Sequence, residues 1–322
     1  MEILDVDLTG FERGDGARRR AVVDGVRRSL ETGFVYVRHD LDEDELEACY
    51  AALATFFALP ADVKARTAAP GSRGQRGYTG LLVEVAAGRT TADWKEHLNW
   101  GETAPSGSDL GERFPDPYLP PIFPEAEVPG IGALLMSFHR RVARLQRRFL
   151  RIVAEGLGAS TGFFDTMTEH GADLTRAVHY PAMAEIPADE ASPGEPHVWA
   201  AEHGDINLVT ALPRATAKGL QVLTPEGWLD VAPPPGHAVL NSGMMLERLS
   251  NGVLPTGRHR VVADPQQPGD RLAVVQFCHP SPDTILAPMP SCVSQARPEQ
   301  SEPITAANWL AEVLEEIGLA GS

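Results

Sequence analysis

The order of apolar and polar positions predicts helices and isolated strands in the first third of the chain. Residues 2–8 alternate apolar and acidic side chains, which favours a short strand. Residues 17–31 carry apolar side chains at helical spacing, and the β-branched and aromatic run 34–37 predicts another strand. Asp42 followed by Glu45 resembles a capping box, and the helix that it starts should stop at Leu59-Pro60.

The middle of the chain combines irregular segments with its clearest helix. Residues 67–80 are rich in glycine, arginine, serine and threonine, and we expect a loop there. Residues 101–129 hold many prolines and glycines and should form an irregular connection. From Ile131 to Val153, one apolar stripe faces a run of arginines. We interpret these arginines as a solvated helix face rather than an anion site.

Beyond residue 174 the pattern changes to short β-rich runs separated by glycine and proline. The runs cover residues 176–180, 206–212, 219–223, 228–231, 237–240, 259–263 and 271–278. Several short strands between turn signals favour an all-β sandwich or barrel. An amphipathic helix over residues 305–317 should close the chain. The predicted fold is therefore mainly β with flanking helices.

Charge and composition narrow the class of partner. A chain of 322 residues with net charge −16 is not expected to bind nucleic acid or a membrane. No apolar run approaches the length of a bilayer span, and the acidic N-terminus does not resemble a signal peptide. The three cysteines are too few and too scattered for a disulfide framework. We therefore expect a cytoplasmic protein that acts on a small molecule.

One pair of residues has the spacing of metal ligands. His203 and Asp205 lie at positions i and i+2, so both would point to one face of an extended segment. A second imidazole from a distant strand would complete a two-histidine, one-carboxylate triad, which is typical of non-haem Fe(II) oxygenases. Chance alone often supplies one such pair in a chain of this length. The pair therefore needs support from the rest of the chain.

That support comes from motifs in the same order as in a known family. Residues 241–252 followed by His259-Arg260 resemble the segment before the distal metal histidine of iron- and 2-oxoglutarate-dependent dioxygenases of the isopenicillin N synthase-like family. The same resemblance covers Gly219-Leu220-Gln221, the Arg271-x-Ala273-x-x-x-Phe277 strand, and the upstream motifs at residues 33–37, 56–64, 76–80 and 93–96. Since these matches span almost the whole chain, the resemblance is specific.

The resemblance implies a fold, a reaction and a set of site residues. The fold would be a double-stranded β-helix, or jelly roll. Residues 1–125 would form an N-terminal helix and strand region packed on a core of residues 126–322, and the two would make one integrated unit. His203, Asp205 and His259 would bind Fe(II). Arg271 would pair with the distal carboxylate of 2-oxoglutarate, since a guanidinium can hold a carboxylate bidentately, with help from Tyr180.

One departure from the family pattern keeps alternatives open. Where the family has a serine two residues after the arginine, this chain has Ala273, so one hydroxyl donor to 2-oxoglutarate is missing. An ethylene-forming branch of the family resembles this chain in having the Arg-x-Ala sequence. Because the hydroxyl is missing, a 2-oxoglutarate-independent Fe(II) oxidase, as in isopenicillin N synthase, also stays possible. A non-catalytic jelly-roll binding protein would be favoured only if a metal ligand were lost.

The preferred hypothesis is an oxygenase that uses Fe(II), 2-oxoglutarate and O₂ to oxidise an unactivated C–H bond of a small molecule. Hydroxylation is expected first, with desaturation or cyclisation as other outcomes of the same chemistry. The substrate would come from amino-acid-derived or natural-product (secondary) metabolism, and the enzyme would be a monomer or weak homodimer. The candidate substrate contacts are Tyr78, Trp94, Lys95, His197, Trp199 and Phe277.

Overall fold

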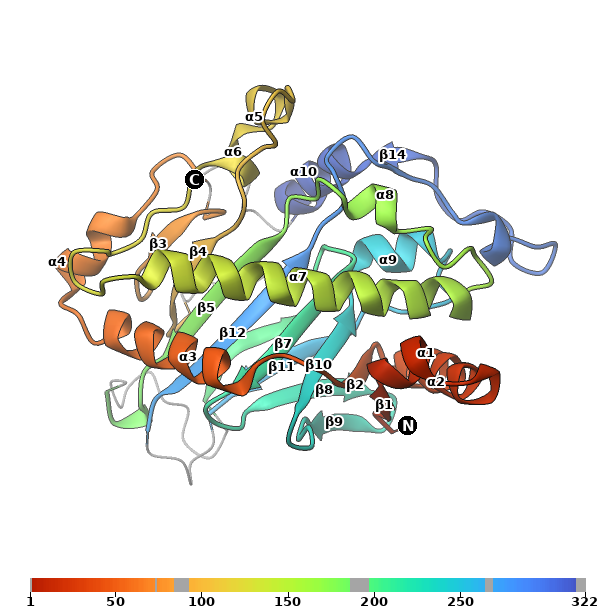
Figure 1. Cartoon of the computed structure of the whole chain (residues 1–322), viewed down its shortest axis with the longest axis horizontal. Helices are drawn as coiled ribbons and strands as arrows, with labels where there is room; N and C mark the ends of the chain where they lie inside the picture. The colour runs from red at the N-terminus through yellow and green to blue at the C-terminus, as the bar shows by residue number, and fades with distance from the viewer. Residues whose placement is uncertain (1, 73, 84–92, 186–196, 264–268, 317–322) are drawn as a thin grey trace.

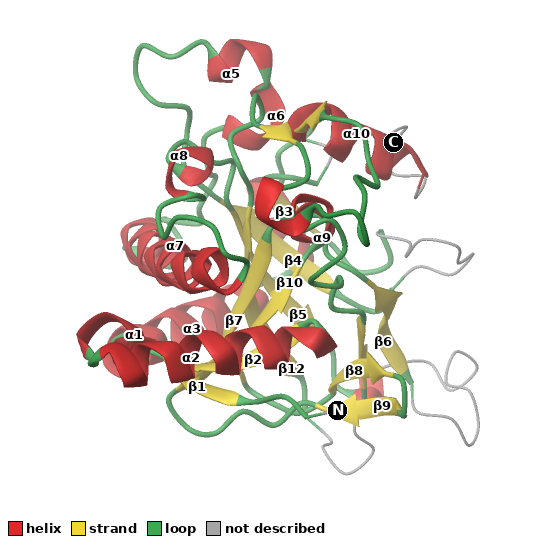
Figure 2. Ribbon diagram, turned by 90° about the vertical axis from the view of Figure 1, so that its right-hand side faces the viewer, coloured by secondary structure: helices red, strands yellow, loops and turns green. Residues whose placement is uncertain are grey.

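The computed structural model describes residues 2–72, 74–83, 93–185, 197–263 and 269–316. Helices cover one face of a large sheet, and a smaller sheet lies against its other face (Figures 1 and 2). The large sheet has eight strands in the order β1-β2-β10-β7-β12-β5-β4-β3. The small sheet has four strands in the order β6-β11-β8-β9. This arrangement confirms the predicted class, mainly β with flanking helices.

The strands of the large sheet come from both halves of the chain. They are β1 (Asp5–Asp7), β2 (Phe34–Arg38), β3 (Gly77–Thr79), β4 (Glu96–Trp100), β5 (Leu174–Tyr180), β7 (Val209–Ala215), β10 (His237–Ser242) and β12 (Arg271–Cys278). The first four precede residue 101, and they occupy the two edges of the sheet. The N-terminal part of the chain therefore extends the sheet that the C-terminal strands begin.

The small sheet carries the segment with the histidine–aspartate pair. Its strands are β6 (Val198–His203), β8 (Leu220–Thr224), β9 (Gly227–Asp230) and β11 (His259–Val262). A third sheet is a two-stranded ribbon of β13 (Ile285–Leu286) and β14 (Ile304–Thr305). Because β6 and β11 are antiparallel neighbours, the ends of two distant chain segments meet there.

Ten α-helices are described. They are α1 (Leu8–Arg13), α2 (Gly16–Ser29), α3 (Glu43–Phe57), α4 (Ala61–Lys64), α5 (Leu110–Arg113), α6 (Pro115–Tyr118), α7 (Ile131–Gly156), α8 (Asp165–Thr168), α9 (Met244–Leu249) and α10 (Ala306–Glu316). Helices α1, α2, α3 and α7 lie over the outer face of the large sheet (Figure 1). Four short 3₁₀ turns, at Leu30–Thr32, Ala65–Thr67, Met183–Glu185 and Pro290–Cys292, complete the set. No single described helix has both the length and the apolar character to cross a bilayer. Helix α3 and the segment Ala61–Thr67 have them only when taken together, and the two are bent by 115° relative to each other.

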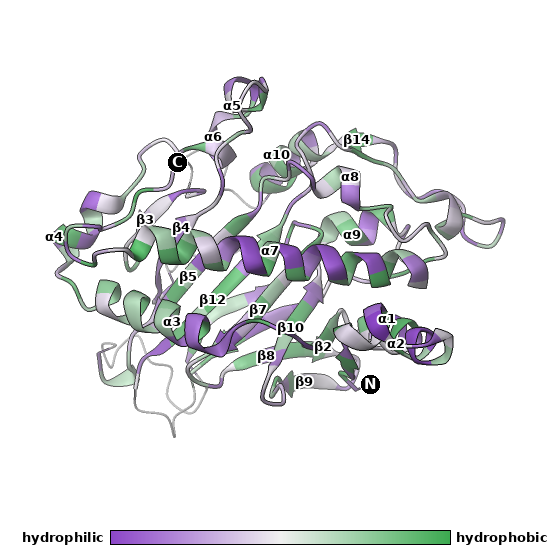
Figure 3. Ribbon diagram, in the orientation of Figure 1, coloured by the Kyte–Doolittle hydropathy of each residue, from purple (hydrophilic) through white to green (hydrophobic). Residues whose placement is uncertain are grey.

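Helix α7 anchors the core. Its apolar side chains, Leu135, Phe138, Val142 and Phe149 among them, are buried against the large sheet, and green and purple patches alternate along the helix in Figure 3. The buried Gln146 donates from Nε2 to the carbonyl of Gln276 at 2.7 Å. This bond ties the helix to the backbone of β12, which carries Arg271.

The arginines of α7 form a largely exposed face, as we predicted, and they also bind other segments. Most of them pair with carboxylates of other segments: Arg140 with Glu102 at 2.7 Å, Arg141 with Glu45 at 2.6 Å, Arg148 with Glu12 at 2.6 Å and with Asp40 at 2.7 Å, and Arg151 with Asp165 at 3.1 Å. These side chains are partly exposed, so each pair contributes little to stability by itself. Together they join α7 to segments that lie far apart in sequence.

The element predictions hold for the long helices and for most strands. The structure confirms the strand 271–278, the helices that begin after Asp42 and near residue 131, and the closing helix. The predicted strand 2–8 is shorter in the structure, where β1 covers only Asp5–Asp7, and the Asp7 side chain accepts a hydrogen bond from Thr9 N and caps α1. The predicted loop 67–80 is wrong at its end, where β3 pairs with β4.

Candidate metal centre

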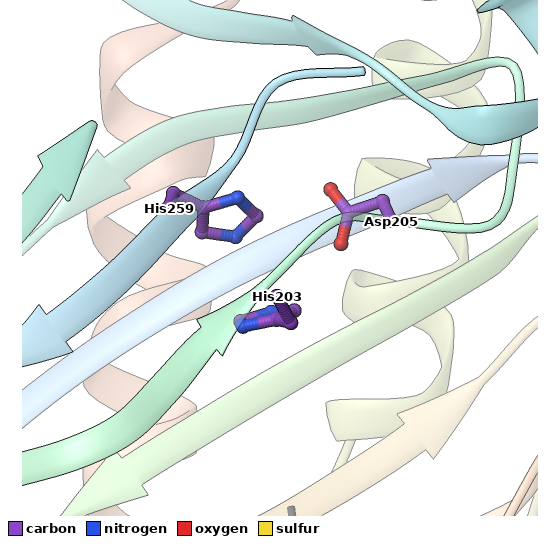
Figure 4. A group of neighbouring side chains, drawn as sticks. All are labelled: His203, Asp205 and His259. Carbon is purple, nitrogen blue, oxygen red and sulfur yellow. The ribbon is translucent and has the colours of Figure 1, made fainter. Parts of the chain in front are cut away.

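The three predicted metal ligands converge at one end of the small sheet (Figure 4). His203 is the last residue of β6, and Asp205 lies in the turn that follows. His259 is the first residue of β11 and is the cross-strand partner of His203. The two ring centroids are 4.3 Å apart. One ligand atom from each residue lies within 4.8 Å of the other two, which suits a common metal ion.

Hydrogen bonds orient all three side chains. His203 Nδ1 lies 2.7 Å from the carbonyl of Ala201, and His259 Nδ1 lies 3.1 Å from the carbonyl of Gly257. A carbonyl can only accept, so each Nδ1 donates its proton there, which leaves Nε2 as the ring nitrogen that can bind a metal. Backbone carbonyls commonly hold metal-binding histidines in this way.

The carboxylate of Asp205 is buried and held by two side chains. Thr210 Oγ1 donates to Asp205 Oδ2 at 2.6 Å, and Asn241 Nδ2 donates to the same oxygen at 2.7 Å. Burial by itself would raise the pKa of Asp205, but the neighbouring histidines and these two donors outweigh it and hold the pKa below its ordinary value. The second oxygen, Oδ1, is therefore the atom that can bind a metal.

The electrostatics also suit a metal. Desolvation by the surrounding protein, together with the neighbouring His259, lowers the pKa of His203 to about 4. A neutral imidazole is the form that binds metal ions. Two neutral imidazoles and one carboxylate form the donor set of non-haem Fe(II) sites, which leaves open positions for other ligands. The residues present therefore fit Fe(II).

A cavity between the two sheets connects the triad with Arg271. Its wall includes the triad, Arg271, Tyr180 and Ala273. Arg271 and Tyr180 are cross-strand partners, and the guanidinium carbon lies 5.3 Å from the centroid of the tyrosine ring. Arg271 is 2% exposed, and its Nε donates to the carbonyls of Ala217 at 3.2 Å and Lys218 at 3.1 Å.

These bonds fit a carboxylate partner for Arg271. Within the described part of the chain, its hydrogen bonds run from Nε alone, so no described residue takes up the two terminal nitrogens. A buried guanidinium is stable when a carboxylate accepts from those nitrogens in pairs. Ala273 presents its methyl group to the same cavity and offers no hydroxyl. The cavity therefore suits 2-oxoglutarate with one donor fewer than the family pattern.

The six predicted substrate residues occupy different places in the structure. Lys95 and Phe277 line the cavity that holds the triad. Trp199 is 1% exposed and stacks on Tyr180 with ring centroids 5.3 Å apart, and Trp94 packs against the same cluster. These two tryptophans support the wall from behind. His197 precedes β6, and its carbonyl accepts from Ala263 N at 2.8 Å.

Tyr78 lies on the other side of the large sheet. Its hydroxyl hydrogen-bonds to Glu96, and it lines a separate surface cavity of ≈ 610 Å³ beside α4. Neighbouring positions on a strand point to opposite faces, so Glu96 and Lys95 face different cavities. The tyrosine is therefore outside the wall of the triad cavity.

Sequence reasoning missed Arg176, Thr210 and Asn241, all of which line the cavity. A signal for Arg176 was available, since it precedes Tyr180 by four residues on one predicted strand, and an even separation places both on one face. Thr210 and Asn241 also lay in or beside predicted strands. Their role is to donate hydrogen bonds to Asp205, and the spacing of residues along the chain does not predict that the fold brings these three side chains together.

Comparison with known proteins agrees with this geometry. Residues 172–280 match the model of the 2OG-Fe(II) oxygenase superfamily, and residues 4–125 match the N-terminal model described as "non-haem dioxygenase in morphine synthesis". A solved structure of a 2OG-Fe(II) oxygenase family protein from Caulobacter crescentus is 31% identical, with a TM-score of 0.84 over 98% of this chain and 99% of that one. This chain belongs to the 2-oxoglutarate- and Fe(II)-dependent oxygenases.

Other relatives place it within the isopenicillin N synthase-like type. The 2-oxoglutarate-Fe(II) type oxidoreductase hxnY of Emericella nidulans is 29% identical, over 93% of this chain and 86% of the relative. A full-length Neurospora crassa protein, solved in complex with alpha-KG, is 25% identical, with a TM-score of 0.82 over 97% and 95% of the two chains. The fold is thus the jelly roll of these oxygenases. Fe(II) and 2-oxoglutarate are the metal and the co-substrate of this family, and the residues of the cavity fit both.

Proposed function

We propose that this oxygenase oxidises an unactivated C–H bond of a small molecule, with hydroxylation as the first expected outcome. The observation that supports the proposal is the shared cavity, in which His203, Asp205 and His259 converge opposite the Arg271–Tyr180 pair. When bound, Fe(II) and 2-oxoglutarate supply the oxidation: 2-oxoglutarate and O₂ become succinate and CO₂, and one oxygen atom goes to the substrate.

The residues of the chain position the reactants. The three triad residues would hold the metal on one face and leave the opposite face open. Arg271 would hold the distal carboxylate of 2-oxoglutarate with its terminal nitrogens, with Tyr180 beside it. Apolar side chains of Leu212, Val239 and Val261 line the same cavity, and apolar surroundings strengthen charged contacts of this kind.

A second candidate function follows from Ala273. Without the hydroxyl at this position, a 2-oxoglutarate-independent Fe(II) oxidase is the alternative, and an ethylene-forming type of reaction on 2-oxoglutarate is another. An arginine–carboxylate pair contributes more than one neutral hydrogen bond, which is typically about 1 kcal/mol. We therefore favour 2-oxoglutarate as the co-substrate. Desaturation and cyclisation stay alternatives to hydroxylation.

The proposal extends to the setting of the enzyme. We propose a monomer or weak homodimer in the cytoplasm, with a role in secondary metabolism. The three cysteines, Cys49, Cys278 and Cys292, are free and buried, which is typical of a reducing compartment. Curated relatives include mugineic-acid 3-dioxygenase of Hordeum vulgare, 28% identical over 94% of this chain and 82% of the relative. This relative supports a small-molecule substrate.

Anaerobic titration tests the metal centre and the co-substrate together. Fe(II) followed by 2-oxoglutarate should produce a visible charge-transfer band in the wild-type protein. His203→Ala and Asp205→Ala should abolish the band, because each removes one metal ligand. His170→Ala is the matched control, since His170 is an exposed histidine outside the cavity, and it should keep the band.

Other outcomes separate the candidate functions. Fe(II) binding without a band, and without succinate formation with any substrate tested, would favour the 2-oxoglutarate-independent oxidase. A protein that binds no Fe(II) would exclude the proposed oxygenase altogether.

A further inference from the structure

Phe34 reaches the metal centre from the N-terminal part of the chain. It is the first residue of β2, it is 1% exposed, and it lines the triad cavity. Its ring packs edge to face on that of His259, with ring centroids 5.8 Å apart and an angle of 80° between the two planes. Aromatic pairs attract each other in this geometry. A metal ligand is therefore packed against a side chain that the C-terminal strands do not supply.

The imidazole of His259 is enclosed from both sheets. In the small sheet its cross-strand neighbours are His203 on β6 and Val222 on β8. Phe34, on the large sheet, belongs to one apolar cluster with the buried Val222. Protein interiors are closely packed, so the imidazole cannot turn toward Phe34 unless that ring is displaced. The contact with Phe34 thus limits the orientations that His259 can take.

The backbone next to Phe34 holds the loop that leads to His259. Gly33 has a φ of +77°, a left-handed conformation that favours glycine. A Cβ atom on Gly33 would lie 2.3 Å from Cα of Gly257, and a Cβ atom on Gly257 would lie 2.6 Å from Cε2 of Phe34. The two glycines and the ring therefore interlock where the N-terminal part of the chain meets this loop.

Hydrogen bonds continue this contact to the imidazole itself. Ser242 N donates to the carbonyl of Gly33 at 3.0 Å, and Gly257 N donates to the carbonyl of Ser242 at 2.9 Å. The carbonyl of Gly257 then accepts from His259 Nδ1 at 3.1 Å. The partner of the second ring nitrogen sets the orientation of a metal-binding histidine. The direction of His259 Nε2 therefore depends on how β2 is placed.

We propose that Phe34 is a positioning residue for the metal, which holds the imidazole of His259 with Nε2 directed at the site shared with His203 and Asp205. This inference rests on the metal centre of the proposed function. Phe34 is not a ligand, so its replacement leaves the whole donor set in place. The expected effect is a weaker and differently shaped metal site in a protein that still folds.

The test uses the whole protein, titrated anaerobically with Fe(II) at saturating 2-oxoglutarate. In Phe34→Leu, the apparent Kd of Fe(II) should rise about three- to tenfold, the size expected for loss of one edge-to-face aromatic pair. The charge-transfer band at saturation should also move from its wild-type position, because the imidazole is no longer held in one orientation. Phe34→Met should have the same two effects, since its flexible side chain fills the space without a ring.

Phe164→Leu is the matched control. Phe164 is also 1% exposed, and its ring meets that of Phe163 edge to face, with centroids 5.1 Å apart and an angle of 86° between the planes. It is outside the wall of the triad cavity. Leucine at this position removes the same kind of contact, so Tm should fall about as much as in Phe34→Leu. The Kd of Fe(II) and the position of the band should stay at their wild-type values.

The outcomes separate this proposal from the proposed function. If Phe34→Leu and Phe34→Met bind Fe(II) as the wild type does and keep its band, the positioning role is overturned and the oxygenase stands. If Phe164→Leu weakens Fe(II) binding equally, the effect is a general loss of stability and the positioning role is also overturned. If Phe34→Leu does not fold, Phe34→Met decides by the same two measurements. If the wild-type protein itself binds no Fe(II), the proposed function fails.

Discussion

At the scale of single residues, the metal centre depends on groups that do not touch the metal. Asp205 can present one oxygen to Fe(II) because Thr210 and Asn241 hold the other. Partners of this kind typically change metal affinity by roughly 10- to 100-fold when they are removed. Thr210 is therefore a positioning residue.

Replacement of Thr210 by valine should weaken Fe(II) binding by roughly tenfold or more, because valine keeps the shape and removes the donor to Asp205. Titration with Fe(II), followed through the charge-transfer band, measures the effect. Thr210→Ser keeps the hydroxyl and should restore most of the affinity. Equal Fe(II) affinities in the valine variant and the wild type would show that Asp205 needs no such support.

The residue scale also shows which sequence signals were sufficient. His203 and Asp205 were accessible from their spacing, and His259 and Arg271 only through the resemblance of their surroundings to a family pattern. Arg176 needed one more step, the recognition that an even separation from Tyr180 puts both side chains on one face. Tyr78 needed the register of β3 and β4, which places it on the opposite side of the sheet from the triad.

At the scale of elements, local signals decided where helices begin. Asp42 caps α3 by accepting hydrogen bonds from Asp44 N at 3.0 Å and Glu45 N at 3.1 Å. The expected partner bond from Glu45 is absent from the described contacts, since its carboxylate instead binds Ser137 at 2.6 Å and Arg141 at 2.6 Å. The cap is therefore made by Asp42, and Glu45 fastens α3 to α7.

Loss of the cap should destabilise the whole protein modestly. Asp42→Ala leaves two amide groups of α3 without their acceptor, and we expect the free energy of unfolding to fall by about 1 kcal/mol. Urea denaturation measures the difference. Asp42→Asn keeps an acceptor and should lie close to the wild type, and Asp24→Ala, at an exposed site within α2, serves as the control. An effect as large in Asp24→Ala would argue against capping as the cause.

Strands were harder to predict than helices where their side chains are polar. In β4, Glu96, His97 and Asn99 are all buried, so the usual alternation of apolar and polar residues is missing. Two of these buried polar groups have partners from other segments, since Glu96 accepts from Lys64 and Asn99 accepts from Arg176. Such a partner is not visible in a local window of sequence.

At the scale of the whole molecule, a buried charge network joins the N-terminal part to the jelly roll. Glu96 on β4 binds Lys64 of α4 at 2.7 Å and His179 of β5 at 2.8 Å, and the Tyr78 hydroxyl also donates to it. The other nitrogen of His179 lies 2.9 Å from Asp270, next to Arg271. The network thus connects three segments of the first hundred residues to the strand that carries Arg271. The division at residue 125 stays a prediction.

The charges of the network shift the pKa values in opposite directions. Burial alone would raise the pKa of Glu96, but hydrogen bonds from His179, Lys64 and Tyr78 outweigh it and lower the pKa below its ordinary 4.5. Burial alone would lower the pKa of His179, but Glu96 and Asp270 outweigh it and raise the pKa above its ordinary 6.5. The ordinary values describe the unfolded chain.

These shifts predict how stability depends on pH. The contribution of His179 is present in full below its unfolded pKa of 6.5 and is lost as the pH rises through the higher folded value. The contribution of Glu96 is present above 4.5 and is lost as the pH falls through the lower folded value. Both contributions are complete between these two unfolded values.

We therefore expect the difference in Tm between the wild type and His179→Gln to be largest between the two unfolded values and to shrink as the pH rises above 6.5. Thermal unfolding of both proteins across this range measures it. His170→Gln, at an exposed histidine, should follow the wild type throughout. A Tm difference that does not change with pH would mean that His179 acts through packing alone, for instance through its stacking on Phe57 at 5.2 Å.

The sequence by itself determined the fold class, the long helices, most strands and the family, because these depend on periodicity, capping residues and ordered motifs along the chain. Only the tertiary structure decided which polar residues share a cavity. It placed Arg176 and Lys95 beside the triad and Tyr78 on the far side of the sheet, and it supplied Asp205 with Thr210 and Asn241. The reason is that strand register and sheet order bring together residues far apart in sequence, and the local pattern of a chain carries no record of these pairings.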